Sequence, residues 1–314
     1  MPWKTTAATA GLGIAALMLA ACGGGGDPLA GNSSAAPSAA ASDSTAARPI
    51  VVGSAAFTES AILAEMYSQA LTAKGIASST KLDIGAREVY IKALQDKSIS
   101  VVPEYTGNLL DYFSAQPVTA TTGKEIEAAL PQALPAELKT LRPAKAADQD
   151  VYVVTKEFAA AKGIASLTDL KKVSGEVILG GLPELETRSY GKPGLENIYG
   201  VKLKEFKPYP SPAVKTKDLL DGKIQLASYF TTESVITDNG LVQLEDPQAM
   251  ILPQNVVPLV RSEVAANSAV VSTIEAVQAA LTTEDLTALN KRVSAERQEP
   301  KQVAAEYLKE KGLA

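Results

Sequence analysis

Apolar and polar positions recur with two different spacings from about residue 49 onward, and these spacings predict alternating strands and helices. The apolar stretch PIVVGSAAF (49–57) predicts a buried strand. FTESAILAEMYSQALTAKG (57–75) then places its large apolar side chains three and four residues apart, as on one face of a helix. Gly75 suits the position that follows a helix end. The folded part therefore begins with a strand, a loop and a helix.

The same unit recurs along the chain in two series. Such alternation is typical of helices packed on a largely parallel sheet. We predict strands at 79–84, 99–102, 148–158, 177–181, 204–209, 224–230 and 255–264, and helices at 88–96, after Thr106, and near 124–130, 167–173, 194–199, 214–221, 267–280, 283–293 and 301–311. The pattern predicts an α/β protein.

Two extended segments of similar character, 148–158 and 255–264, lie at the ends of the second series. One leaves the first series and the other returns to it, which predicts two α/β lobes joined by two crossover segments. We expect residues 49–149 together with 252–314 in lobe 1, and residues 150–251 in lobe 2. A ligand would then lie in the cleft between the lobes.

The N-terminal residues have a different composition. Lys4 precedes an apolar run from 11 to 21 that is too short to span a bilayer, which is typical of a secretion signal. LAAC, ending at Cys22, resembles a bacterial lipobox. The resemblance implies cleavage before Cys22 and lipidation of its thiol, which would anchor the protein to the outer face of the cytoplasmic membrane. The alternative is an ordinary signal peptide with an incidental cysteine.

The segment after the lipobox is rich in Gly, Ser, Ala and Pro and has almost no large apolar side chain. Such a segment cannot bury enough surface to fold, and it serves as a flexible tether. We therefore expect a lipoprotein signal peptide at 1–21, and the lipidated cysteine with its linker at 22–48.

The composition excludes several classes of function. Of 314 residues, 46% are hydrophobic and 21% charged, which is enough to bury a core. The net charge is −5 and no basic run with interleaved aromatic residues occurs, which argues against a nucleic-acid partner. The chain has no histidine and one cysteine, so we exclude a Ser-His-Asp triad and a zinc site. No phosphate loop or EF-hand motif is present, and we predict no cofactor.

Aromatic residues stand at three strand ends, although they make up only 5% of the chain. Tyr105 ends a strand in VVPEYTG, Tyr152 lies on the first crossing, and Tyr229 with Phe230 ends IQLASYF. Singly, each fits ordinary packing. Together they are candidates for an aromatic box, which attracts a diffuse cation by roughly 0.5–2 kcal/mol per contact. Arg188 would complement a ligand carboxylate, its alternative being a surface salt bridge.

Several segments between about residue 49 and the C-terminus form a recognisable series. They are VVGSAAFTESAILAEMYSQAL, GAREVYIKAL, VVPEYTGNLL, LGGLPELETR, FTTES, NGLVQLED, QNVVPLVR and LTTEDLTALN. In this order they resemble the substrate-binding proteins of osmoprotectant ABC importers. The resemblance implies a type II periplasmic-binding-protein fold whose two lobes close over the ligand. It implies a monomer that is not an enzyme, binds a quaternary ammonium compound (glycine betaine, choline, carnitine or proline betaine), and delivers it to ABC permease and ATPase subunits.

The resemblance also assigns roles to individual residues. Tyr105 and Tyr152 fall on aromatic cage positions, and Phe230 falls on a third, with Tyr229 as a one-residue alternative. Arg188 matches the arginine that grips a betaine carboxylate. The ligand is expected to lie between these aromatic side chains and the guanidinium group.

Other positions near the expected ligand either support or depart from the family pattern. Thr106 and Asp150 are expected backbone or side-chain contacts. Ala55 and Ser60 stand where family members often have lysine and glutamine, and Gln254 stands where strong betaine binders carry a tyrosine. The loss of one aromatic wall, worth about 1 kcal/mol, would weaken binding roughly fivefold. We therefore expect a weaker or differently specific binder.

Two other readings stay open from the sequence. The same fold could bind a different polar compatible solute or an amino acid in a more polar box. An extracytoplasmic hydrolase could use Glu104 and Glu184 as acid and base, and would then need the two carboxylates about 5–9 Å apart across the cleft.

Overall fold

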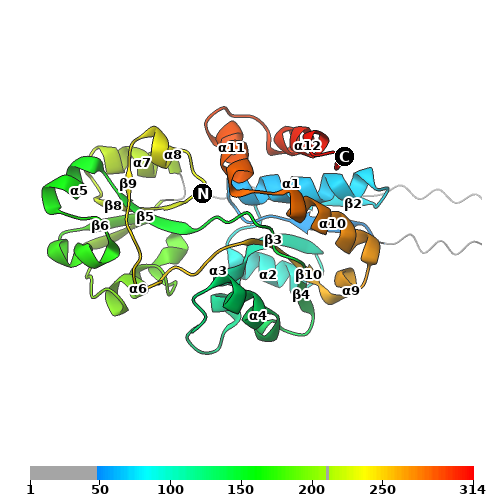
Figure 1. Ribbon diagram of the computed structural model, residues 1–314, viewed down its shortest axis with the longest axis horizontal. Helices are drawn as coiled ribbons and strands as arrows, with labels where there is room; N and C mark the ends of the chain where they lie inside the picture. Colours follow the sequence, from blue (N-terminus) through cyan, green and yellow to red (C-terminus); the bar gives the residue numbers. More distant parts are fainter. Residues whose placement is uncertain (1–47, 210–211) are drawn as a thin grey trace, which may run out of the picture. The chain divides into compact units, whose positions relative to one another are not determined.

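The computed structural model describes residues 48–209 and 212–314, which fold around two five-stranded sheets with helices packed against them (Figure 1). The predicted α/β fold class is confirmed. The predicted signal peptide, the lipidated Cys22 and the linker up to residue 47 lie outside the described residues. We call each sheet together with its helices a lobe.

The sheet of lobe 1 has the strand order β2-β1-β3-β10-β4. These strands are β1 (Ile50–Gly53), β2 (Ser78–Lys81), β3 (Val101–Tyr105), β4 (Leu138–Thr140) and β10 (Val256–Arg261). β1 pairs in parallel with β2 and β3, whereas β10 runs antiparallel to both β3 and β4. The sheet is therefore mixed, and only its three N-terminal strands follow the predicted parallel arrangement.

Helices cover both faces of this sheet, so its strands read as nearly continuous apolar runs. Val101 on β3 packs into the core cluster with side chains of α1, α10, α11 and α12, whereas its neighbour Val102 packs into a second cluster with side chains of α2, α3 and α4. The first group is α1 (Thr58–Ala73), α10 (Ser268–Ala280), α11 (Thr283–Ser294) and α12 (Pro300–Glu310), and the second is α2 (Arg87–Gln95), α3 (Thr106–Phe113) and α4 (Gly123–Ala133). The short α9 (Ser262–Ala265) follows β10.

The sheet of lobe 2 repeats this plan with the order β7-β6-β8-β5-β9. Its strands are β5 (Asp150–Val154), β6 (Ile178–Gly181), β7 (Glu205–Pro208), β8 (Leu226–Phe230) and β9 (Val242–Gln243). β6 is parallel to β7 and β8, and β5 is antiparallel to β8 and β9. Each lobe thus combines three parallel strands with antiparallel ones.

The helical segments of lobe 2 are short, and one of them corrects a predicted strand. The strand expected at 148–158 ends at Val154, because the hydroxyl of Thr155 accepts the Phe158 N–H at 3.2 Å and caps a helix. The segments are α5 (Lys156–Lys162), α6 (Lys192–Asn197), α7 (Pro212–Leu220), α8 (Val235–Asp238) and two 3-10 turns, Leu167–Val173 and Pro183–Glu186. The strands β4 and β9 were not predicted from the sequence. They are three and two residues long, too short for an alternation of apolar and polar residues to be recognised.

The returning crossover segment is tied to the start of α3. The Thr106 N–H donates to the Asn255 carbonyl at 3.0 Å, and the Asn255 N–H donates to the Thr106 hydroxyl at 3.1 Å. At Gly107 a Cβ atom would lie 2.6 Å from the Pro253 carbonyl oxygen, so only glycine permits this close approach. The predicted residue limits of the two lobes stay predictions.

Candidate functional site

A cavity of about 250 Å³ is lined by residues of both lobes. Its lining comes from the segments that follow β1, β2, β3 and β6, from the last residues of β3 and β8, and from the first residue of β5. Ligands of open α/β sheets bind outside the carboxyl ends of the strands, and this cavity has that position. Its volume lies just below the ~300–1,000 Å³ range of most ligand pockets, which suits a small solute.

Three aromatic rings form one side of the cavity, and we call them the aromatic wall. Phe57 directly precedes α1, Tyr105 ends β3, and Phe230 ends β8. The Phe57 ring centroid lies 6.1 Å from that of Tyr105 and 5.3 Å from that of Phe230. Tyr105 and Phe230 were predicted from the sequence. Phe57 was missed, although it stands at the same kind of strand-to-helix junction.

The pairing of β5 with β8 decides which side chains of these strands face the cavity. Asp150 lies opposite Phe230, and Val151 lies opposite Tyr229. Opposed residues of an antiparallel pair share one face of the sheet, and the next pair occupies the other face. Asp150 and Phe230 accordingly line the cavity together, whereas Tyr229 points to the opposite face.

Neither Tyr152 nor Tyr229 reaches the cavity wall. Tyr152 is buried in the core of lobe 2, where its hydroxyl donates to the Tyr190 carbonyl at 2.7 Å. Tyr229 is buried on the other face of the sheet, and the Lys215 ammonium lies 3.9 Å from its ring centroid. An internal cation therefore already occupies the face of Tyr229. The structure supports Phe230 over its one-residue alternative.

The hydroxyl of Tyr105 connects the aromatic wall to a buried acidic cluster. It donates to Glu59 at 2.6 Å, and Glu59 also accepts hydrogen bonds from Thr232 at 2.9 Å and Asn290 at 2.5 Å. Asp148, on the first crossing, accepts the Thr232 N–H at 2.9 Å. Burial raises the pKa of Glu59, and burial together with the negative charge of Glu59 raises the pKa of Asp148. The cluster joins α1, α11 and the loop after β8 behind the wall.

The substitution Glu59→Gln is expected to flatten the dependence of stability on pH and to stabilise the protein at neutral pH. Because the folded-state pKa of Glu59 is raised, its contribution to stability is full below the unfolded-state value near 4.5 and is lost as the pH rises through the folded-state pKa. Glutamine stays neutral at every pH. Urea unfolding between pH 4 and 8 measures the effect.

Glu157→Gln serves as the control for the unfolding measurements. Glu157 is exposed on α5 and takes no part in the hydrogen bonds of the buried acidic cluster. It should leave the pH profile of the wild-type protein unchanged. A Glu59→Gln variant that keeps the wild-type decline in stability towards neutral pH would show that the decline arises elsewhere.

Arg87 lines the cavity, but its charge is engaged within lobe 1. Its guanidinium donates to both carboxylate oxygens of Glu104, at 2.7 and 3.0 Å, and the Tyr90 hydroxyl donates to the same carboxylate at 2.5 Å. Glu104 is fully buried. It is therefore not available as the acid or base of a hydrolase, and the carboxylate pair with Glu184 that this reading required is not formed at the cavity.

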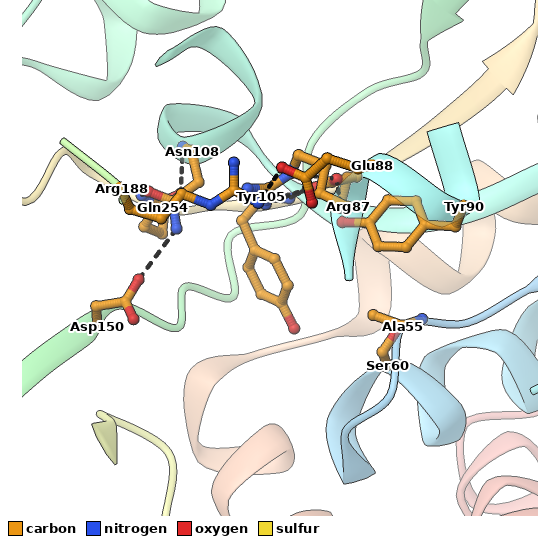
Figure 2. A network of polar contacts seen from close by, with 11 residues as sticks. Ala55, Ser60, Arg87, Glu88, Tyr90, Tyr105, Asn108, Asp150, Arg188 and Gln254 are labelled. Carbon is orange, nitrogen blue, oxygen red and sulfur yellow. Dashed lines mark hydrogen bonds and ion pairs between the residues drawn. The ribbon is translucent and has the colours of Figure 1, made fainter. Parts of the chain in front are cut away.

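Arg188 lies in the segment after β6 and lines the cavity. Figure 2 shows its guanidinium extending toward Glu88. Its Nη2 lies 2.7 Å from Glu88 on α2, so this ion pair joins lobe 2 to lobe 1. Its Nε is buried and has no hydrogen-bond partner among the described residues. The guanidinium carbon lies 5.8 Å from the ring centre of Tyr112. Glu88 thus engages the Nη2 end of Arg188, whereas its Nε–H group stays unpaired among the described residues.

Asn108 and Asp150 form a second contact between the lobes. The Asn108 side-chain amide donates to Asp150 Oδ2 at 3.0 Å. Gln254 holds Asn108 in place, because its Nε2 donates to Asn108 Oδ1 at 2.6 Å and its Oε1 accepts the Asn108 backbone N–H at 3.0 Å. Gln254 and Thr106 are buried behind the cavity and do not line it. Of the predicted polar contacts Thr106, Asp150 and Gln254, only Asp150 lines the cavity.

Sequence reasoning missed several other lining residues. Ala55, which was named from the sequence, lines the cavity, and its N–H donates to the Ser60 hydroxyl at 2.9 Å. The missed residues that carry chemistry are Arg87, Tyr90, Asn108 and Tyr190. GAREVY, which contains two of them, was singled out as a motif, but no role was assigned to either residue. Within residues 48–209 and 212–314, no group of three or more acidic, histidine or cysteine side chains could hold a metal ion.

Comparison with known proteins agrees with this geometry. The family model described as the substrate binding domain of ABC-type glycine betaine transport systems matches residues 48–310. The glycine betaine-binding protein YehZ of Escherichia coli K12 is 28% identical over 280 residues, which cover 85% of this chain and 92% of that protein. The glycine-betaine-binding protein of Pseudomonas aeruginosa is 25% identical over 282 residues, with 85% and 89% covered.

Solved structures show the same fold. A glycine betaine/carnitine/choline ABC transporter protein superposes with a TM-score of 0.67 at 20% identity, covering 84% of this chain and 99% of that one. The apo form of YehZ from Escherichia coli superposes with a TM-score of 0.61 at 27% identity, covering 85% and 100%. The predicted two-lobed binding-protein fold is thereby confirmed.

Proposed function

The chain belongs to the family of substrate-binding domains of ABC-type glycine betaine transport systems, and on this premise we propose that it binds a quaternary ammonium osmoprotectant and delivers it to an ABC importer. The ligand is glycine betaine, choline, carnitine or proline betaine. The partners are the permease and ATPase subunits, and the protein acts as an extracytoplasmic monomer. The homologues are transport proteins and not enzymes, which removes the hydrolase reading.

The observation that carries this proposal is the aromatic wall of Phe57, Tyr105 and Phe230. A quaternary ammonium group has no N–H to donate, so hydrogen-bond acceptors cannot recognise it specifically, whereas aromatic faces attract its diffuse charge. The rings come from both lobes, so a bound cation would hold the lobes together. The ion pair of Arg188 with Glu88 and the hydrogen bond of Asn108 to Asp150 would add to this closure.

Isothermal titration of the purified protein against the four quaternary ammonium compounds tests the proposal, with an uncharged sugar and an anionic amino acid as controls. Saturable heat with at least one quaternary ammonium compound, and none with the controls, is the expected result. Heat with the amino acid alone would replace the proposal with the reading of a different polar solute. A folded protein that is silent with every quaternary ammonium compound would overturn the ligand class.

We further propose that Cys22 carries a lipid that anchors the protein to the outer face of the bacterial cytoplasmic membrane. LAAC at 19–22 supports this anchor. No helix within 48–209 or 212–314 is both long and apolar enough to cross a bilayer.

Substituting Cys22→Ser is expected to abolish incorporation of labelled fatty acid, because serine lacks the thiol that is acylated. Labelling of expressing bacterial cells followed by membrane fractionation measures this. Undiminished labelling of the serine variant would show that the lipid is attached elsewhere or that the label is not specific.

A further inference from the structure

The charged side chains that line the cavity do not balance. They are Arg87, Asp150, Glu184 and Arg188. The charge of Arg87 is paired with Glu104, and that of Arg188 is paired with Glu88. Asp150 and Glu184 form no salt bridge with the described residues. Each arginine is thus neutralised by its own glutamate, and the two remaining carboxylates give the cavity wall a net negative charge.

Of the two lining carboxylates without a salt bridge to the described residues, Asp150 is the one paired with a strand of the aromatic wall. It begins β5 directly opposite Phe230, and both side chains line the cavity. Its Oδ2 accepts one hydrogen bond from Asn108, and its Oδ1 accepts none from the described residues. Gln254 fixes the Asn108 amide so that its NH2 group points at Asp150 (Figure 2). The second carboxylate oxygen is left for a ligand.

We propose that Asp150 is a specificity-determining residue, whose carboxylate makes the site favour quaternary ammonium cations without a carboxylate, such as choline, over zwitterionic betaines. The inference rests on the proposed function. A cation against Phe230 is attracted by the neighbouring carboxylate. The carboxylate of a betaine is repelled by it, and at the Nη2 end of Arg188 it would compete with Glu88. A hydroxyl group, by contrast, can donate to Asp150 Oδ1 and accept from an N–H group.

The expected size of this preference follows from the distances within so small a cavity. At an effective dielectric constant of about 20, two charges about 6–10 Å apart interact strongly enough to change affinity roughly 10- to 100-fold.

The preference should also depend on pH. Burial, opposed by the hydrogen bond from Asn108, raises the pKa of Asp150 to about 6. The other charges acting on this carboxyl group are those of Arg87 and Lys215, which lower its pKa, and that of Glu184, which raises it. Above this pKa the carboxylate is charged and discriminates between the ligands. Well below it, Asp150 is neutral and the discrimination disappears.

Titration calorimetry with choline, propyltrimethylammonium and glycine betaine at pH 7.5 and pH 5.0 tests the inference. Propyltrimethylammonium has the charge of choline but no hydroxyl group. In the wild-type protein at pH 7.5, both cations are expected to bind about tenfold or more tightly than glycine betaine. Asp150→Asn keeps the acceptor for Asn108 but not the charge, and it should bring the ratio close to one. In the wild-type protein the ratio should be smaller at pH 5.0 than at pH 7.5, because most of Asp150 is then neutral in the free protein.

Glu186→Gln is the matched control, because Glu186 is an exposed carboxylate of the same turn as Glu184 and does not line the cavity. It should keep the wild-type ratio. Equal binding of cations and glycine betaine by the wild-type protein, or an equal change for all three ligands in Asp150→Asn, would overturn the inference and leave the proposed function standing. A wild-type protein that binds none of the three would overturn the proposed function itself.

Discussion

Replacing Glu104 with alanine is expected to lower the free energy of unfolding by about 3–5 kcal/mol, because it leaves a buried arginine without its counter-charge. Glu104 is fully buried, and the Arg87 side chain is only 10% exposed. Glu104 accepts two hydrogen bonds from Arg87 and one from the Tyr90 hydroxyl. Urea-induced unfolding at pH 7 measures the loss.

Removing all three polar partners together should cost much less than removing one of them. The triple variant Arg87→Met, Tyr90→Phe, Glu104→Leu leaves no unpaired charge or hydroxyl in the cluster, and such replacements of buried ion pairs are often neutral. The cost that stays is the hydrogen bond at 3.0 Å from the Tyr105 N–H to Glu104. Asp221→Ala is the control at the surface, since it breaks an exposed pair with Lys217 and should cost less than about 1 kcal/mol. If Glu104→Ala costs no more than this control, the buried pair does not stabilise the fold.

Exchanging Phe57 and Phe230 together for leucine is expected to weaken choline binding by about 1–4 kcal/mol, or roughly fivefold to nearly a thousandfold. Leucine keeps most of the apolar contact but has no π face. The two rings contact each other, with centroids 5.3 Å apart, so the two single effects need not add. Titration calorimetry of the single and double variants measures the affinities.

Tyr229→Leu offers a matched control for the aromatic wall, because Tyr229 neighbours Phe230 in the chain but faces away from the cavity. It should leave the affinity for choline unchanged, although the buried ring contributes to stability. Phe230→Tyr keeps a π face and should retain most of the binding. If Tyr229→Leu weakens binding as much as Phe230→Leu does, the side chains of β8 face the ligand differently from what the structure shows.

Binding of a neutral isostere separates the charge of the ligand from its shape. In 3,3-dimethylbutanol a carbon atom replaces the nitrogen of choline, so the cation–π attraction is absent. We expect it to bind more weakly than choline to the wild-type protein, and the difference should shrink in the double leucine variant. Equal binding of both compounds by the wild-type protein would mean that the wall recognises only shape.

The sequence by itself was sufficient for most helices and strands and for the fold class. The helix at 57–75 and the strand at 224–230 were predicted within a few residues of α1 and β8. These elements are determined by local spacing, because apolar residues must recur on the one face that packs against the core. The resemblance in PEYTG also singled out Tyr105, which lines the cavity in the structure.

Which side chains line the cavity could be seen only in the tertiary structure. Sequence reasoning could not choose between Tyr229 and Phe230, because a shift of one residue in strand pairing exchanges the two faces of a strand. The pairing of Asp150 with Phe230 favours Phe230 as the cavity residue, and it brings Asp150, which forms no salt bridge with the described residues, beside the aromatic wall. Gln254, expected at a position of the ligand cage, instead holds Asn108 from behind. Contacts between segments far apart in the chain depend on how the lobes and crossover segments pack, and a local sequence pattern does not predict them.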